Sequence, residues 1–245
     1  MNLNKKVILV TGGSGLIGKE IINHITSQNG IAINLDIRCE DDLENRSLLF
    51  DVTNENSIYN GIDRVLSFYG KIDGLVNNAY PKTDDWINKL EDVSSESFIK
   101  NVEMQLSQIF SVSKPVLQIM KKQKTGSLVN IASIYGMVGN DFTLYEGTNL
   151  TSPVAYSAIK GGLINLNRYF ASYFGKYNVR SNCVSPGGIY NNQNPDFVKR
   201  YNKKVPMKRM GEATDISPIV SFLLSDSAKY ITGQNIAVDG GWTSI

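Results

Sequence analysis

The chain has 245 residues with 25 basic and 23 acidic side chains, which gives a formal net charge of +2 at pH 7. Hydrophobic residues make up 42% and charged residues 20%, a composition typical of a globular protein that buries a large core without disulfides. The balanced charge argues against a protein that binds nucleic-acid phosphates, and no run of about 18 apolar residues predicts a membrane span.

Cysteine and histidine are scarce. Cys39 and Cys183 cannot build a disulfide framework, and neither has a Cys or His neighbour at metal-ligand spacing. His24 is the only histidine, which excludes a multi-histidine metal site and disfavours a Ser-His-Asp triad. The N-terminal residues do not have the pattern of a signal peptide. We therefore expect no metal and a reduced, cytoplasmic location.

Short apolar runs alternate with amphipathic segments along the chain. The first run, residues 7–10, is continuous and β-branched, as in a strand that is buried on both faces. In the next segment Ile17, Ile21 and Ile25 share one helix face. Similar patterns predict strands at 31–36, 47–51, 74–77, 127–131, 179–184 and 235–238, and helices at 57–69, 94–120, 153–176 and 215–224. We expect the helix at 94–120 to be bent or interrupted near Pro115.

Strands that alternate with long helices predict an α/β fold, in which a parallel sheet is covered on both faces. We expect a Rossmann-type doubly wound sheet of about seven strands. Because no linker rich in Pro, Gly or Ser is present, residues 1–245 are expected to form a single domain. Its cofactor half would be about 1–130, and its catalytic and substrate half about 131–245.

A glycine-rich loop joins the first predicted strand to the first predicted helix. Gly13, Gly15 and Gly18 match G-x-G-x-x-G, in which a dinucleotide pyrophosphate approaches backbone amides at a helix N-terminus. The glycines alone also fit a plain strand-to-helix turn, but the flanking strand and helix favour the cofactor. The residues expected to contact it are Gly12, Ser14, Gly15, Leu16, Ile17 and Gly18.

Asp36 ends the second predicted strand, 18 residues beyond Gly18, near the offset of a ribose-binding acid. Its carboxylate can accept both adenosine ribose hydroxyls and would repel a 2′-phosphate. Ile37 follows it, and the glycine loop contains no Lys or Arg, so the sequence favours NAD over NADP. Arg38 leaves two readings open: a solvated loop charge, or a partner for a 2′-phosphate.

Together with the glycine loop, three later segments resemble the short-chain dehydrogenase/reductase (SDR) superfamily, in its classical subfamily. They are 77–80 (Asn-Asn-Ala-Tyr), Ser133, and Tyr156 with Lys160. The resemblance extends from Lys5 to 238–241 (Val-Asp-Gly-Gly). It implies that Ser133 and Tyr156/Lys160 are catalytic and that the protein is an NAD(P)-dependent oxidoreductase acting on CH–OH groups. It also implies cofactor contacts from Asp51, Val52, Asn78, Ala79, Tyr80, Pro186, Gly187 and Ile189, with Tyr80 in place of the family's glycine.

Three departures from the family are visible. The glycine spacing is closer to the extended subfamily, although the chain is too short for that subfamily's added substrate domain. The catalytic helix asparagine of the family corresponds here to Gln105, 28 residues before Ser133, whereas Asn101 is one turn too early. The segment between Ser133 and Tyr156 is also longer than in the family, with the extra residues near 140–149.

The catalytic residues fit proton transfer. An unperturbed tyrosine has a pKa of about 10, and a nearby ammonium group stabilises its phenolate. Lys160 lies four residues after Tyr156, so both share one helix face. A Tyr-x-x-x-Lys pair also occurs by chance on helices, but its combination with Ser133 and the glycine loop favours catalysis. Gln105 would either hold the water that the family's asparagine holds or reach the substrate.

Two polar segments are expected to face the substrate. The insert brings Asp141, Tyr145, Glu146, Thr148 and Asn149, and residues 190–194 (Tyr-Asn-Asn-Gln-Asn) follow the sixth predicted strand. Unpaired amides are costly to bury, so a polyhydroxylated sugar or nucleotide sugar fits these groups better than an acyl chain. The basic residues between Lys199 and Arg209 either form a solvated lid or attract an anionic substrate.

The insert at 145–148 and the segment 185–189 also prompt a looser similarity to dehydrogenases of bacterial surface-glycan and nonulosonic-acid pathways, hence to carbohydrate biosynthesis. Two alternatives stay open: a 3-oxoacyl-thioester reductase, and a non-catalytic dinucleotide sensor on the same fold. The family resemblance further implies a homo-oligomer, a tetramer or dimer, in which the helices at 94–120 and 153–176 pair across a two-fold axis.

Overall fold

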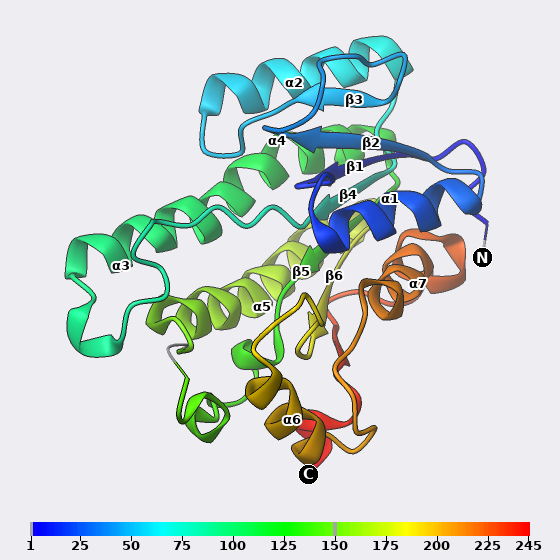
Figure 1. The fold of residues 1–245 in the computed structure, drawn as a ribbon. Coiled ribbons are helices and arrows are strands. Elements are labelled where there is room, and N and C mark those ends of the chain that lie inside the picture. The colour runs from blue at the N-terminus through cyan, green and yellow to red at the C-terminus, as the bar shows by residue number, and fades with distance from the viewer. Residues whose placement is uncertain (1, 149–150) are drawn as a thin grey trace.

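A computed structural model describes residues 2–148 and 151–245 (Figure 1). All seven predicted strands are present, within two residues of their expected bounds. They are β1 (Val7–Thr11), β2 (Ile31–Asp36), β3 (Ser47–Leu49), β4 (Gly74–Asn77), β5 (Gly126–Ile131), β6 (Val179–Pro186) and β7 (Asn235–Val238).

The strands form one parallel sheet in the order β3-β2-β1-β4-β5-β6-β7. This is the doubly wound topology, in which the chain reverses its direction of progress between β1 and β4. Loops that leave the carboxyl ends of these two strands diverge, and a ligand crevice opens between them. The predicted single-domain α/β Rossmann fold is confirmed.

Helices cover both faces of the sheet (Figure 1). On one face α1 (Leu16–Ser27) packs against α7 (Ala213–Leu224), and its residues Ile21 and Ile25 are fully buried. On the other face lie α2 (Glu55–Tyr69), α4 (Gln108–Gln123) and α5 (Val154–Phe174). The central strands β1 and β4 are buried along their whole length, which explains the continuous apolar run of β1, whereas the edge strands β3 and β7 are partly exposed.

The long helix predicted at 94–120 has its irregularity in a different place. It consists of α3 (Ser95–Val102), a π-helical turn at Glu103–Ser107, and α4, which continues through Pro115. The expected interruption near Pro115 is therefore wrong. A proline removes one backbone donor, and α4 tolerates that loss, whereas the extra residue of the π turn rotates the helix beside the site.

One further helix, α6 (Pro195–Lys204), was not expected from the sequence. Its composition is mostly polar and basic, and its apolar face is limited to Phe197, Val198 and Tyr201. Its start nevertheless carries ordinary signals: Asn194 accepts from the amide of Asp196 at 2.9 Å, and Pro195 occupies the first turn. Among the described residues, no helix is both long and apolar enough to cross a membrane.

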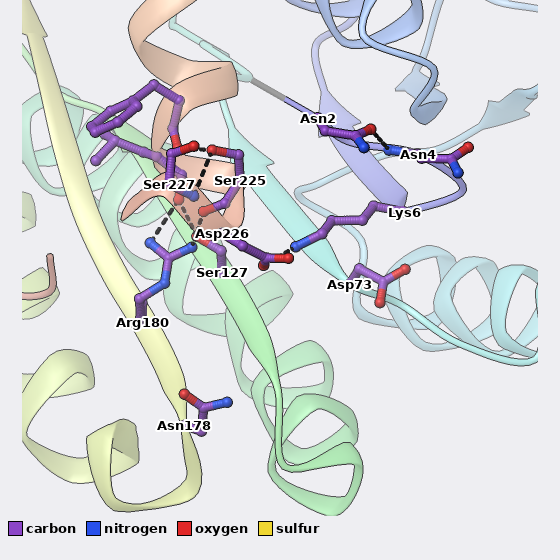
Figure 2. Close-up of polar contacts among 12 residues, drawn as sticks. Asn2, Asn4, Lys6, Asp73, Ser127, Asn178, Arg180, Ser225, Asp226 and Ser227 are labelled. Atoms are coloured by element: carbon purple, nitrogen blue, oxygen red, sulfur yellow. Dashed lines mark hydrogen bonds and ion pairs between the residues drawn. The ribbon is translucent and has the colours of Figure 1, made fainter. Parts of the chain in front are cut away.

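Arg180 on β6 fixes the C-terminal end of α7 beneath the sheet (Figure 2). Its guanidinium donates to the carbonyl oxygens of Leu223 at 2.7 Å and Ser225 at 3.1 Å. The Ser127 hydroxyl donates to the same Leu223 oxygen at 2.9 Å. These donors satisfy carbonyls that a helix end leaves without intrahelical partners.

Candidate active site

A cleft of about 630 Å³ opens at the carboxyl ends of the strands. It contains most of the predicted site residues, although these come from segments more than 170 residues apart. The predicted residues that line it are Gly12, Gly15, Leu16, Ile17, Asn78, Tyr80, Ser133, Tyr156, Lys160, Pro186, Gly187 and Ile189.

The glycine loop forms one end of the cleft. Gly12 has a φ of +65°, and a Cβ there would lie 2.8 Å from the Cα of Ala79, so only glycine fits. The Asn78 amide donates to the carbonyl oxygens of Thr11 at 3.1 Å and Gly12 at 3.0 Å, which ties this loop to the end of β4. No side chain caps the first turn of α1, so its amides remain available to an anion in the cleft. Ser14 and Gly18 shape this loop without lining the cleft.

Asp36 lies behind the loop and is 4% exposed. Its carboxylate accepts from the backbone amides of Ser14 at 3.0 Å and Arg38 at 2.9 Å. Asp36 Oδ1 also accepts from the Arg38 side chain, whereas Oδ2 has the Ser14 amide alone and retains an acceptor site for a ribose hydroxyl. The Arg38 side chain is 65% exposed and lines the cleft, and its Nε lies 3.4 Å from Asp36.

The other predicted adenosine-side residues lie outside the cleft lining. The Ile37 side chain is 64% exposed and Val52 is buried. One oxygen of Asp51 accepts from the Thr53 amide at 2.8 Å and hydroxyl at 2.7 Å. These residues flank the glycine-loop end, where an adenine ring can reach them only at the cleft margin.

Ser133, Tyr156 and Lys160 meet at the floor of the cleft. Ser133 follows β5, and its hydroxyl donates to the Tyr156 hydroxyl. The Lys160 Nζ lies 5.5 Å from the centroid of the Tyr156 ring and donates to the Ile131 carbonyl at 2.8 Å. The structure therefore brings together the three residues that the sequence singled out from two distant segments.

Burial dominates the ionisation of this group. It raises the pKa of Tyr156, an effect that the Ser133 hydrogen bond opposes. Burial also lowers the pKa of Lys160 to about 8. Burial at the base of the cleft thus disfavours both the Tyr156 phenolate and the Lys160 ammonium when each is charged alone. When both are charged, their mutual attraction favours the phenolate–ammonium pair.

Tyr80 adds an aromatic wall beside the catalytic tyrosine. Its ring lies edge-on to Tyr156 at 5.8 Å and to Trp86 at 5.7 Å, and the Lys160 Nζ is 5.7 Å from its centroid. The buried Trp86 donates a hydrogen bond to the Tyr80 hydroxyl. The residue that replaces the family's glycine therefore contacts the catalytic pair directly.

Gln105 lies in the π-helical turn and is 2% exposed. Neither its amide nitrogen nor its amide oxygen has a hydrogen-bond partner among the described residues. Such a group is costly unless a water or ligand satisfies it. Asn101, by contrast, is engaged with Thr83 and Ser97, so it holds a loop in place.

Beyond β6, the turn at 186–189 carries the predicted nicotinamide-side residues. The Gly187 amide donates to Val238 at 3.0 Å, and the Gly188 amide donates to the hydroxyl of Tyr201 on α6 at 2.6 Å. Tyr201 stacks on Trp242 at 4.8 Å. The C-terminal residues therefore help to position α6 over the cleft.

The insert packs onto α6, and only part of it faces the cleft. Tyr145 lines the cleft, whereas Asp141 pairs with Lys204 and Glu146 is exposed. Thr148 donates to the carbonyl of Tyr145 at 2.7 Å, and Asn149 lies outside the described residues. Of the five polar residues at 190–194, Asn191 and Gln193 line the cleft. The expected polar wall is thus narrower than the sequence implied, because short polar side chains in this insert bond to their own loop.

The basic run does not reach the cleft. Its members Lys199, Arg200, Lys203, Lys204, Lys208 and Arg209 are all absent from the cleft lining. Arg209 forms a two-pronged ion pair with Asp215, and Arg200 donates to the Leu144 carbonyl at 3.3 Å. These contacts favour the interpretation that the basic residues form a solvated lid, and not the interpretation that they attract an anionic substrate. Likewise, His24 contacts Ser221 on α7 at 2.8 Å, which is a helix-packing role.

Sequence reasoning missed several lining residues. They are Arg38, which was left open, and Tyr135, Thr151, Phe197, Tyr201 and Met210. Phe197 and Tyr201 are four residues apart on α6, a spacing that could have revealed a common helix face. Tyr135 lies two residues after Ser133, in a short turn whose direction no local pattern specifies.

A family model described as enoyl-(acyl carrier protein) reductase matches residues 33–243. The chain belongs to the short-chain dehydrogenase/reductase superfamily. This SDR protein is 36% identical to post-translational flagellin modification protein A of Campylobacter coli, over 98% of this chain and 99% of that protein. It is 34% identical to 7alpha-hydroxysteroid dehydrogenase of Bacteroides fragilis, over 97% of this chain and 94% of that enzyme.

Solved SDR structures have the same fold. A short-chain dehydrogenase from Leptospira borgpetersenii with bound NAD+ superimposes with a TM-score of 0.89 at 34% identity, covering 99% of this chain and 94% of that one. Levodione reductase gives a TM-score of 0.85 at 26% identity, covering 99% of each chain. The oxidoreductase class and the SDR fold expected from the sequence are therefore confirmed.

Proposed function

We propose that this SDR protein is an NAD-dependent oxidoreductase that interconverts a secondary alcohol and a ketone on a polyhydroxylated substrate of the sugar class. One observation carries the proposal: Ser133, Tyr156 and Lys160 meet at the floor of a cleft whose far end carries a glycine cradle and Asp36. The proposal assigns the cofactor to a half at about 1–130 and the catalytic chemistry to a half at about 131–245.

The residues of the cradle fit a nicotinamide dinucleotide. Gly12 leaves no room for a side chain, the first-turn amides of α1 are uncapped, and Asp36 offers a buried acceptor site. The Leptospira relative supports this assignment because it was crystallised with NAD+. When bound, the nicotinamide supplies the hydride chemistry. The turn Pro186–Ile189 and Asn78 would hold its other end.

The protein's own residues handle the proton. Tyr156 accepts the proton of the substrate hydroxyl during oxidation and returns it during reduction. The Lys160 ammonium stabilises the phenolate that forms on Tyr156, and the Ser133 hydroxyl orients the substrate oxygen. Gln105 is assigned to a water that satisfies its buried, unpartnered amide.

The substrate class follows from the residues that line the cleft opposite the glycine cradle. Tyr145, Thr151, Asn191 and Gln193 supply polar groups there, beside the rings of Phe197 and other aromatic residues. A sugar ring presents both hydroxyls and apolar C–H faces, so it matches such a mixed wall. The flagellin-modification relative supports a role in glycan synthesis.

A 3-oxoacyl-thioester reductase is the second candidate. It is favoured by the family model and by relatives such as 3-oxoacyl-[acyl-carrier-protein] reductase of Escherichia coli, which is 30% identical over 98% of both chains. Met210 and Phe197 also line the cleft. Two features argue against this candidate. The cleft wall carries the polar residues named above, and the acidic side chain of Asp36 disfavours the 2′-phosphate of NADPH, the cofactor that such reductases normally use.

The deciding experiment is a turnover screen that follows NADH at 340 nm with sugars, nucleotide sugars, acetoacetyl thioester and simple ketones. We expect turnover of polyhydroxylated substrates above that of the thioester. The reverse order would favour the second candidate. Binding of NADH without turnover of any substrate would instead support a dinucleotide sensor.

A further inference from the structure

A chain of side-chain hydrogen bonds links the insert to the catalytic helix. It begins at Ser157, next to Tyr156 on α5, whose hydroxyl donates to the Asn140 amide oxygen at 2.6 Å. The Asn140 amide nitrogen donates to the Ser152 hydroxyl. Ser152 in turn is hydrogen-bonded to the Tyr145 hydroxyl, which also contacts the Tyr135 hydroxyl. None of these five side chains was assigned a catalytic role above.

The side-chain amide of Asn140 fixes which group donates and which accepts along this series of hydrogen bonds. Its oxygen can only accept, so Ser157 donates to it, and its nitrogen can only donate, so Ser152 accepts. The proton of Ser152 is then directed to the Tyr145 oxygen. Tyr135 donates to the same oxygen, and this bond helps to raise the pKa of Tyr135, although burial is the larger cause.

Tyr145 is left with a single hydrogen-bonding capacity. A phenol has one donor and two acceptor sites, and both acceptor sites of Tyr145 are occupied. Among the described residues its own proton has no acceptor, so this proton is available to a ligand in the cleft that Tyr145 lines. Packing fixes the ring, because its centroid lies 5.4 Å from that of Phe197 and 6.3 Å from that of Phe142. Such a donor is preorganised before a ligand arrives.

Charge in the cleft limits the ligand group that this donor can meet. Arg38 and Lys160 are the charged residues that line the cleft in the part of the chain that the structure describes. Lys160 lies under the catalytic tyrosine and Arg38 lies at the Asp36 end. Arg200 donates to the Leu144 carbonyl from outside the lining, so a carboxylate or phosphate beside Tyr145 would find no cation in that part of the cleft wall, whereas an uncharged oxygen needs only one donor.

We propose that Tyr145 is a substrate-specificity residue that donates its hydroxyl proton to a second, uncharged oxygen close to the reacting carbon, as in a vicinal diol or a hydroxyketone. This inference deepens the proposed function and rests on it. Tyr145 and Tyr156 line the same cleft, so a ligand whose reacting carbon lies at Tyr156 extends toward Tyr145.

A matched pair of small substrates tests the proposal. 2-Hydroxycyclohexanone and cyclohexanone differ only in the second oxygen, and both can be reduced with NADH. One neutral hydrogen bond contributes about a factor of ten. We expect wild-type protein to prefer the hydroxyketone in kcat/KM by about this factor, and Tyr145→Phe to bring the ratio of the two kcat/KM values down to about one.

A second set of variants tests the order of donors and acceptors in this series of hydrogen bonds. Asn140→Asp presents acceptors on both sides, so Ser152 would donate to it and Tyr145 would turn its proton toward Ser152. We expect this variant to lose the preference as Tyr145→Phe does. Ser157→Ala is the matched control, because it removes the far end of the chain without reversing it, and should keep the preference.

Saturation-transfer NMR of cis-1,2-cyclohexanediol and cyclohexanol gives a readout that needs no turnover. Tighter binding of the diol to wild type, lost in Tyr145→Phe, is expected. A preference that Tyr145→Phe retains, or equal binding of the two alcohols, would overturn the role of Tyr145 while leaving the oxidoreductase proposal intact. Failure of wild type to reduce any ketone, with the binding preference present, would overturn only the proposed function.

Discussion

At the residue scale, we expect Asp36 to distinguish between the two nicotinamide cofactors. Its carboxylate is 4% exposed and is held by two backbone amides, so it cannot swing away from an added phosphate. Like charges at close range in a partly desolvated site repel strongly. Arg38 is the one neighbour that could compensate, but its side chain is largely exposed.

We therefore expect NAD(H) to bind at least about tenfold more tightly than NADP(H), a difference of about 1.4 kcal/mol. Isothermal titration with both cofactors measures this. Asp36→Asn should narrow the gap, and Arg38→Ala should leave NAD affinity nearly unchanged. Equal affinities in the wild-type protein would show that Arg38 binds the 2′-phosphate.

Tyr156 should be needed for chemistry and dispensable for cofactor binding. Tyr156→Phe removes the hydroxyl that exchanges the proton but leaves the glycine cradle and Lys160 in place. We expect turnover to fall by at least about a factor of 100, with NADH affinity, measured by fluorescence, nearly unchanged. Lys160→Ala should weaken both. Substantial activity in Tyr156→Phe would mean that another group carries the proton.

The pH dependence of the two reaction directions should be opposite. The pair Tyr156/Lys160 loses its first proton near the pKa of Lys160, which burial lowers to about 8. Oxidation uses the deprotonated pair, so its kcat/KM should rise with pH through about 8. Reduction uses the protonated pair, so its kcat/KM should fall through the same range. Lys160→Arg removes a titrating group, and a midpoint unchanged in that variant would contradict this assignment.

At the element scale, the sequence was most informative where one physical cause acts alone. The strand β1 is buried on both faces and apolar along residues 7–10, so its sequence alone identifies it, and the other six strands were located by shorter apolar runs. The helix α6 was missed because its apolar face is short and lies among basic residues, and tertiary contacts of Tyr201 with Gly188 and Trp242 hold it in place. The site residues were found through motifs, but the inward turn of Tyr145 depends on bonds to Ser152 and Tyr135, which no local spacing encodes.

The end of α7 offers a stability test at this scale. Arg180→Met would leave the Leu223 carbonyl with Ser127 alone and would remove the donor to Ser225 (Figure 2). A half-buried carbonyl without its partner costs about 1–3 kcal/mol, and urea unfolding should show a lower midpoint with an unchanged slope. Lys6→Met, which breaks the exposed pair with Asp226, is the control and should have little effect. Equal losses in the two variants would contradict the role given to Arg180.

At the scale of the whole molecule, an aromatic stripe on α5 remains exposed. Tyr169 is 62% and Tyr173 is 49% exposed, and their rings stack at 6.0 Å. Phe110 on α4 is 48% exposed. Figure 1 shows α4 and α5 running on the same side of the sheet. Large apolar groups gathered on one face are typical of an interface rather than of a free surface.

We therefore expect a homo-oligomer, a dimer or a tetramer, in which α4 and α5 pair with the same helices of a second copy. Such an interface is self-complementary, so a charge placed on it meets its own copy across the two-fold axis. The double variant Tyr169→Glu/Tyr173→Glu should thus shift sedimentation equilibrium at micromolar concentration toward the monomer. Tyr59→Glu, at a 40% exposed position on α2, is the matched control and should keep the wild-type mass. A monomeric wild-type protein, or a double variant with unchanged mass, would contradict this interface.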